Sequence, residues 1–235
     1  MKTGIVFCYL LAGIVLCIGT ASGTVVSLSD ADKSLIVKTH NDIRSDVSPT
    51  AANMIKLEWS DVLANIAHTH AEKCTYAHSD KTERNKAGAP SFSSVGENIL
   101  AGVFYKIDYQ DLINNQWGAE KQHYSYPNCN SGEDCGHYTQ IAWAKTTHVG
   151  CAVADCPFYI PGYRLTILVC NYGPAGNFDG VKPYIQGSSC TQCPAGLNTC
   201  SNKLCSFGST VDTSSSQEAF IQLIMNMMEA ERERE

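Results

Sequence analysis

The chain opens on an apolar run rather than on a periodic pattern. Residues Ile5 to Ile18 form this run, Lys2 is the only charge before Asp30, and small residues occupy 19–23. A positive start, an apolar core and a small-residue region predict a secretory signal peptide over residues 1–21. A membrane anchor is the alternative, but the run has about 14 residues and a span needs roughly 20.

Three later segments have the apolar spacing of amphipathic helices. The first follows Ser29, which with Asp32 forms a variant of the capping box that has Asp in place of Glu. The second follows Ser60, and the third covers Tyr109 to Lys121. These segments predict helices that each bury one side.

Two further segments have the composition of strands. His148 to Asp155 and Arg164 to Tyr172 are rich in Val, Ile, Leu and Cys. The residues between them include Pro157, Pro161 and Gly162, which predict a turn. Helices flanking a short sheet predict an α/β (α+β) layered domain.

The cysteine content points to an oxidising compartment. The sequence has 12 cysteines, and removal of the signal peptide would take away Cys8 and Cys17. Ten would remain, an even number, so we expect disulfides and a secreted, extracellular protein. The net charge of −6, with no basic run, makes nucleic acid and anionic membrane surfaces poor partners.

The composition changes twice in the C-terminal part. Residues 186–206 contain four cysteines and almost no core-forming residues, so we expect a cysteine-rich hinge held by crosslinks. Residues 207–235 begin as a Ser/Thr-rich flexible tail. Apolar residues then predict a short amphipathic helix over 217–228, which is too short to span a membrane.

Four motifs occur in the order found in one known family: His40-Asn41-Asp42-Ile43-Arg44, Gly96-Glu97-Asn98-Ile99, Gly136-His137-Tyr138-Thr139-Gln140-Ile141-Ala142-Trp143, and residues 167–178. On these motifs, residues 30–185 resemble the CAP superfamily of cysteine-rich secretory proteins, antigen 5 and plant class-one pathogenesis-related proteins. The layout with a short hinge is similar to that of glioma pathogenesis-related-like proteins. The resemblance implies a three-layer α-β-α sandwich. We expect the six-cysteine ion-channel regulator module of some relatives to be absent, because no cysteine follows Cys205.

The resemblance also implies a disulfide pattern. The expected pairs are Cys74–Cys156, Cys151–Cys170, Cys129–Cys135, Cys190–Cys200 and Cys193–Cys205. A zinc site is the competing interpretation of the four hinge cysteines, since their spacing also suits a metal.

The family's central cleft holds two histidines and two acidic residues, which map onto His78, His137, Glu97 and Glu120. Two imidazoles with nearby carboxylates suit zinc or another divalent cation, with the carboxylates as ligands or as groups that orient the histidines. The same set would also suit acid–base chemistry. A hydrogen-bonded cluster that binds nothing is the remaining alternative.

The resemblance implies a secreted binding protein for sterol or fatty-acid lipids or for an extracellular protein partner. Lipid sites in the family lie between helices and near a mobile loop, which maps onto residues 124–134 with Tyr124, Tyr126 and Pro127 as its apolar content. A secreted hydrolase, such as a protease, is the alternative. The sequence contains neither G-x-S-x-G nor H-E-x-x-H, so we expect no catalytic residue and no enzyme.

Overall fold

The computed structural model describes residues 6–11, 14–19, 22–104, 106–157 and 164–208, together with Gln222 and Met225. Two predictions fall mainly outside these residues. They are the turn with Pro161 and Gly162, and the short helix over 217–228, of which Gln222 and Met225 are described and helical.

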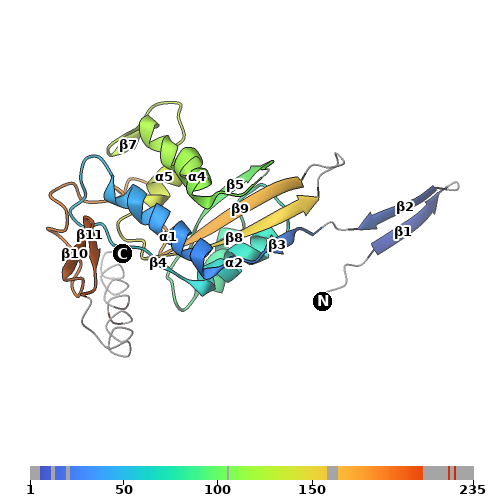
Figure 1. Cartoon of the computed structure of the whole chain (residues 1–235), viewed down its shortest axis with the longest axis horizontal. Helices are drawn as coiled ribbons and strands as arrows, with labels where there is room; N and C mark the ends of the chain where they lie inside the picture. Colours follow the sequence, from blue (N-terminus) through green and yellow to red (C-terminus); the bar gives the residue numbers. More distant parts are fainter. Residues whose placement is uncertain are drawn as a thin grey trace.

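A five-stranded sheet forms the centre of the domain (Figure 1). Its strands lie in the order β3-β8-β9-β5, and β4 pairs in parallel with β8. Strands β8 (His148–Pro157) and β9 (Arg164–Gly173) are antiparallel and contain the two predicted strands. The shorter members, which the sequence pattern did not predict, are β3 (Thr24–Val26), β4 (Glu58–Trp59) and β5 (Gly96–Gly102).

The side chains of the sheet alternate between two helical layers. One hydrophobic cluster joins α1 (Asp30–Ser45) and the region of α4 (Tyr109–Leu112) to one face, and a second cluster joins α2 (Asp61–Ala71) to the other face. In β8, Val149, Cys151 and Val153 belong to the first cluster, whereas Ala152 and Ala154 belong to the second. The fold is therefore the three-layer α-β-α sandwich that the resemblance implies.

Two of the predicted helices begin where the caps indicate. Ser29 and Asp32 form a capping box at the start of α1 (Asp30–Ser45), and Ser60 caps α2 (Asp61–Ala71). Helices α3 (Lys81–Gly88) and α5 (Gly136–Ile141) are additional to the predicted ones.

The third predicted helix, Tyr109 to Lys121, is not one regular α-helix. It divides into α4 (Tyr109–Leu112), the π-helix Ile113–Trp117 and the 3₁₀-helix Gly118–His123. Trp117 is buried where the helix type changes, and Glu120 lies in the 3₁₀ turn. Such local changes of helix type are frequent near functional sites.

The cysteine-rich segment is docked onto the domain. Its hairpin consists of β10 (Thr199–Ser201) and β11 (Leu204–Ser206). The Cys205 N–H donates to the Met54 carbonyl over 2.7 Å, and the Lys56 N–H donates to the Cys205 carbonyl over 2.9 Å. Leu204 is buried among domain residues. The expectation that crosslinks alone hold this segment was therefore incomplete, because it also shares backbone bonds and core contacts with the domain.

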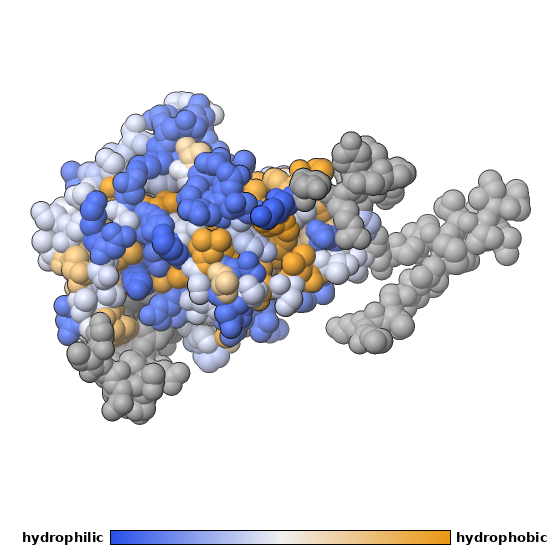
Figure 2. All heavy atoms as spheres, viewed as in Figure 1, coloured by the Kyte–Doolittle hydropathy of each residue, from blue (hydrophilic) through white to orange (hydrophobic). Residues whose placement is uncertain are grey.

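The N-terminal apolar run forms a hairpin of β1 (Val6–Leu11) and β2 (Ile14–Gly19), which extends away from the domain in Figure 1. A smaller hairpin, β6 (Tyr124–Ser125) with β7 (Asn128–Cys129), lies near α5. On the face shown in Figure 2, hydrophilic residues cover most of the α1 side, and hydrophobic residues gather toward the ends of the strands. Among the described residues, no helix has the length and apolar character that a membrane span requires.

Candidate functional site

Glu97 on β5 is the first of the two expected cleft carboxylates, and its side chain is fully buried. Its Oε1 lies 3.0 Å from Nδ1 of His78 and accepts the Ser79 backbone N–H over 2.8 Å. Its Oε2 accepts the Ser79 hydroxyl over 2.6 Å. Arg84 of α3 approaches Oε1 at 3.5 Å. The carboxylate is thus surrounded by donors, as a buried charge requires.

These donors determine the charge of Glu97. Burial by itself raises the pKa of this carboxyl, but the hydrogen bonds from His78 and Ser79 and the charge of Arg84 outweigh burial and lower the pKa to about 2. Glu97 is therefore ionised at neutral pH. Because a carboxylate only accepts, the His78 Nδ1 carries the hydrogen in this contact.

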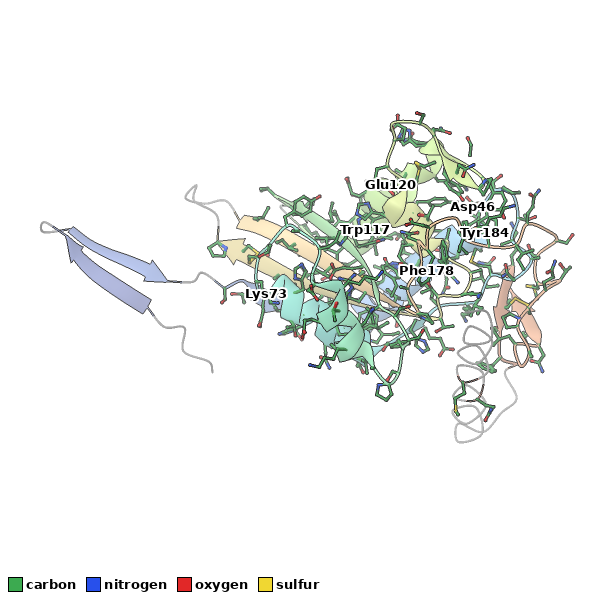
Figure 3. The ribbon with its side chains drawn as sticks, turned by 180° about the vertical axis from the view of Figure 1, so that it is seen from behind. Asp46, Lys73, Trp117, Glu120, Phe178 and Tyr184 are labelled. Atoms are coloured by element: carbon green, nitrogen blue, oxygen red, sulfur yellow. A yellow bond between two sulfur atoms is a disulfide. The ribbon has the colours of Figure 1, made fainter. Side chains whose placement is uncertain are left out.

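Glu120 and His137 form the second pair. The His137 Nδ1 lies 2.5 Å from Glu120 Oε1, and Glu120 Oε2 accepts the backbone N–H groups of His137 and Tyr138, each over 3.0 Å. Figure 3 shows Glu120 close to Trp117. The Trp117 ring stacks on the His137 imidazole, with centroids 5.8 Å apart and planes at 15°. One carboxylate and one aromatic ring therefore fix the imidazole.

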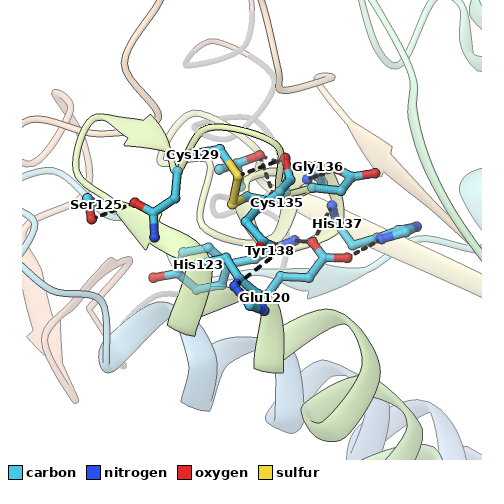
Figure 4. Close-up of a disulfide and its surroundings, with 12 residues drawn as sticks. Glu120, His123, Ser125, Cys129, Cys135, Gly136, His137 and Tyr138 are labelled. Carbon is cyan, nitrogen blue, oxygen red and sulfur yellow. Dashed lines mark hydrogen bonds and ion pairs between the residues drawn. A yellow bond between two sulfur atoms is a disulfide. The ribbon is translucent and has the colours of Figure 1, made fainter.

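The disulfide Cys129–Cys135 lies next to this pair (Figure 4). Cys135 immediately precedes Gly136 and His137 at the start of α5, so the crosslink anchors the chain that enters the pair. The four other expected bonds are also present: Cys74–Cys156, Cys151–Cys170, Cys190–Cys200 and Cys193–Cys205. No free thiol occurs among the described cysteines.

The two histidine–glutamate pairs are connected through the edge strand β5. Glu97 belongs to the first pair, and the next residue, Asn98, donates from its side chain to the His137 carbonyl over 3.1 Å. His78 is 65% exposed and His137 28% exposed, so solvent reaches both rings. The structure therefore places the four predicted residues as two pairs at one edge of the sheet.

No three of these four residues bring their ligand atoms within 4.8 Å of one another. In the described parts of the chain, the one group of three potential metal ligands within 4.8 Å of one another is Cys190, Cys193 and Cys205. These three sulfurs belong to disulfides, and a disulfide sulfur is not the thiolate that zinc requires. The zinc interpretation of the hinge cysteines therefore does not fit the structure.

The loop expected to contact lipid packs its aromatic residues against the domain. Tyr124 contacts Tyr138, and Tyr126 stacks on Tyr184 with ring centroids 4.7 Å apart. The Tyr126 hydroxyl also donates to the Tyr184 carbonyl over 2.7 Å. The two tyrosines of this loop are therefore already in contact with the domain.

A cavity of about 540 Å³ lies between α2 and α3 and adjoins the first pair. Val62, Ile66 and Ala87 form its apolar part, while Lys73, Ser79 and Arg84 are among its polar lining residues. Ser79 and Arg84 both also contact Glu97, so this cavity borders the His78–Glu97 pair.

Three residues of the site were missed in the sequence. Asn98 is part of the motif Gly96-Glu97-Asn98-Ile99, and its place in that motif could have marked it as a site residue. Ser79 follows His78 directly, but only the structure shows its hydroxyl on Glu97. Nothing in the sequence pattern marks Arg84, which reaches Glu97 from an unpredicted helix.

Comparison with known proteins shows a family match over residues 37–172, described as "CAP: Cysteine-rich secretory protein family". Peptidase inhibitor 16 of Homo sapiens is 37% identical over 203 residues, which cover 85% of this chain and 41% of that protein. GLIPR1-like protein 1 of Mus musculus is 40% identical over 166 residues, covering 71% of this chain and 68% of that protein. The chain thus spans about two fifths of peptidase inhibitor 16.

Solved structures give the same result at the level of the fold. The crystal structure of NaASP2 with Zn²⁺ superposes with a TM-score of 0.62 at 25% identity, covering 76% of this chain and 97% of that one. Na-ASP-1 gives a TM-score of 0.61 at 27% identity, covering 85% of this chain and 54% of that one. The family match over most of the domain, the relatives and the shared fold together establish that this chain belongs to the CAP family of cysteine-rich secretory proteins.

Proposed function

We propose that the protein is a secreted binding protein whose His78 and His137 hold zinc or a similar divalent cation. In this proposal Glu97 and Glu120 do not ligate the ion but orient the two imidazoles. The observation that carries the proposal is that each histidine turns its Nδ1 toward a carboxylate, at 3.0 Å and 2.5 Å.

The donor set fits a cation of this kind. With Nδ1–H directed at a carboxylate, the neutral imidazole has its lone pair on Nε2. Histidines that ligate zinc commonly have such a carboxylate on the other nitrogen, which fixes the tautomer and makes the ring more basic. NaASP2, a protein of the same fold, was crystallised with Zn²⁺, which adds support from a relative. A bound ion would supply a positive charge for an anionic or carbonyl group of a partner.

The serine beside the site, Ser79, does not have the contacts of an activated nucleophile. Ser79 lies beside His78, but its hydroxyl donates to Glu97 over 2.6 Å and accepts from Arg84 over 2.8 Å. A serine nucleophile would instead donate to a histidine base. We therefore favour binding over hydrolysis.

Secretion is supported by the five disulfides of the described residues, since such bonds persist in oxidising compartments.

A second candidate function, binding of a fatty-acid type lipid, is favoured by the cavity between α2 and α3. Val62, Ile66 and Ala87 would contact an acyl chain, and the Lys73 ammonium would lie near its carboxylate. We expect protein secreted from eukaryotic cells to release a fatty acid on organic extraction, detected by mass spectrometry. The Val62→Arg variant, which fills the cavity, should release much less, and equal recovery from both proteins would contradict this candidate.

Titration calorimetry with zinc tests the main proposal. We expect binding at about pH 7.5 and weakening below about pH 6.5, because an imidazole must lose its proton to bind a metal. His137→Ala and His78→Ala should each abolish measurable binding. His68→Ala is the matched control, because His68 lies exposed on α2 outside both pairs. Unchanged binding in either site variant, or none in the wild type, would contradict the proposal.

A further inference from the structure

Behind the His137–Glu120 pair lies a chain of buried polar groups with a fixed direction. The His40 Nδ1 lies 2.8 Å from the Ile36 carbonyl, which can only accept, so this nitrogen carries the ring hydrogen. The His40 Nε2 must then accept, and the Tyr172 hydroxyl lies 2.9 Å from it. Burial lowers the pKa of His40 to about 4, so the ring stays neutral near pH 7 and keeps this lone pair.

The donor and acceptor roles are also fixed between Tyr172 and His137, the candidate metal ligand. Because the Tyr172 hydroxyl gives its hydrogen to His40, it accepts from the side-chain amide of Asn98, which is 3.1 Å away. The same amide nitrogen donates to the His137 carbonyl, also over 3.1 Å. Asn98, Tyr172 and His40 are all almost fully buried, so water does not replace these partners.

Trp117 contacts both His40 and His137, the first and last residues of this hydrogen-bonded series. Its ring stacks on His137 and meets His40 edge-on, with centroids 6.5 Å apart. His137 is therefore held by three residues: Glu120 at the ring nitrogen and the backbone N–H, Trp117 at the ring face, and Asn98 at the backbone carbonyl.

We propose that Tyr172 is a positioning residue for His137, acting through Asn98 to fix the backbone that carries the imidazole. This role rests on the proposed function insofar as it concerns a metal ion. The Tyr172 hydroxyl bonds to His40 and Asn98 rather than to His137, and it gives Asn98 a single preferred orientation.

Tyr172→Phe tests this proposal, because it removes the hydroxyl and keeps the ring. In the metal-free protein we expect the imidazole ¹⁵N and ¹H signals of His137 to shift, while those of His78 stay unchanged. Zinc affinity should fall by about tenfold, the lower end of the usual loss for outer-shell partners. Ile167→Val is the matched control. It removes one buried methyl from the same strand, β9, at a residue that is not part of the hydrogen-bonded series of His40, Tyr172 and Asn98.

If Tyr172→Phe does not fold, Asn98→Ala tests the same link and should give the same shift at His137. A His137 spectrum and zinc affinity equal to those of the Ile167→Val control would overturn the positioning role. Absence of zinc binding in the wild type would overturn the proposed function alone, because the metal-free spectrum tests positioning independently.

Discussion

The Glu120 carboxylate binds both the ring and the backbone of His137. Oε1 lies 2.5 Å from the His137 Nδ1, and Oε2 accepts the His137 backbone N–H over 3.0 Å. Glu120 lies in the 3₁₀ turn after the π-helix, and His137 is in the first turn of α5. The irregular end of the predicted third helix is therefore what brings this carboxylate to the imidazole.

Glu120→Gln should weaken both zinc binding and the fold. The amide can present only one oxygen where the carboxylate accepts three N–H groups, so part of this set loses its acceptor. We expect zinc affinity to fall by about 10- to 100-fold. The free energy of unfolding should fall by about 1–3 kcal/mol. Calorimetry and urea unfolding measure the two effects, with Glu133→Gln as the control because Glu133 pairs with His123 outside the site. A loss of stability with unchanged zinc affinity would contradict the orienting role.

Glu97 should make the fold sensitive to acid. Its pKa in the folded protein is about 2, below the value of 4.5 expected for a free carboxyl. A lowered pKa contributes stability that is present above about pH 4.5 and is lost as the pH falls toward 2, by up to about 3 kcal/mol. The difference in unfolding free energy between wild type and Glu97→Gln should therefore shrink between pH 5.5 and pH 3. A difference that stays constant over this range would be inconsistent with a buried carboxylate.

His40 should add a second acid-sensitive range at higher pH. Burial lowers the pKa of His40 from 6.5 to about 4. Between these two pH values His40 is protonated in the unfolded protein and neutral in the folded protein. Stability should then fall as the pH drops from about 6.5 to 4, by about 3 kcal/mol at most. Urea unfolding at pH 7 and pH 5 measures this loss, which should be smaller in His40→Gln than in wild type and unchanged in His68→Gln. Burial also lowers the pKa of His148 to about 4, so His40→Gln keeps the part of the loss that His148 contributes. Equal pH dependence in His40→Gln and wild type would refute the assignment.

The disulfides should differ in their contribution to stability. Cys74–Cys156 closes a loop with a sequence separation of 82, whereas Cys129–Cys135 closes one of 6. Loop entropy then predicts a loss of about 4.5 kcal/mol when the first pair is replaced by serine and about 2 kcal/mol for the second. Thermal and urea unfolding of the two double variants give the ranking. A larger loss for the short loop would mean that the bond contributes mainly through its contacts beside His137.

The sequence predicted the parts of the fold that local chemistry determines. Ser29 and Ser60 marked helix starts because a side chain that caps a helix acts within its own turn. The two long strands were apparent because β-branched and aliphatic residues fill them. Strand β5 was missed because its Gly-Glu-Asn start resembles a loop, and it becomes a strand only by pairing with β9.

The candidate site was only partly accessible from sequence. The family resemblance supplied His78, Glu97, Glu120 and His137, but not their division into two pairs. That division depends on contacts between residues far apart in the chain, such as Asn98 with the His137 carbonyl. The pattern of apolar positions also gave no sign of the π and 3₁₀ turns that position Glu120.

The position of bound zinc tests the proposed site most directly. Crystals soaked in zinc should give an anomalous difference peak at the zinc edge, about 2.0–2.1 Å from the Nε2 atoms of both His78 and His137. We expect Glu97 and Glu120 to stay on the Nδ1 atoms, and His137→Ala crystals to lack the peak. No peak at this edge of the sheet, or an ion bound directly by the two carboxylates, would contradict the proposal.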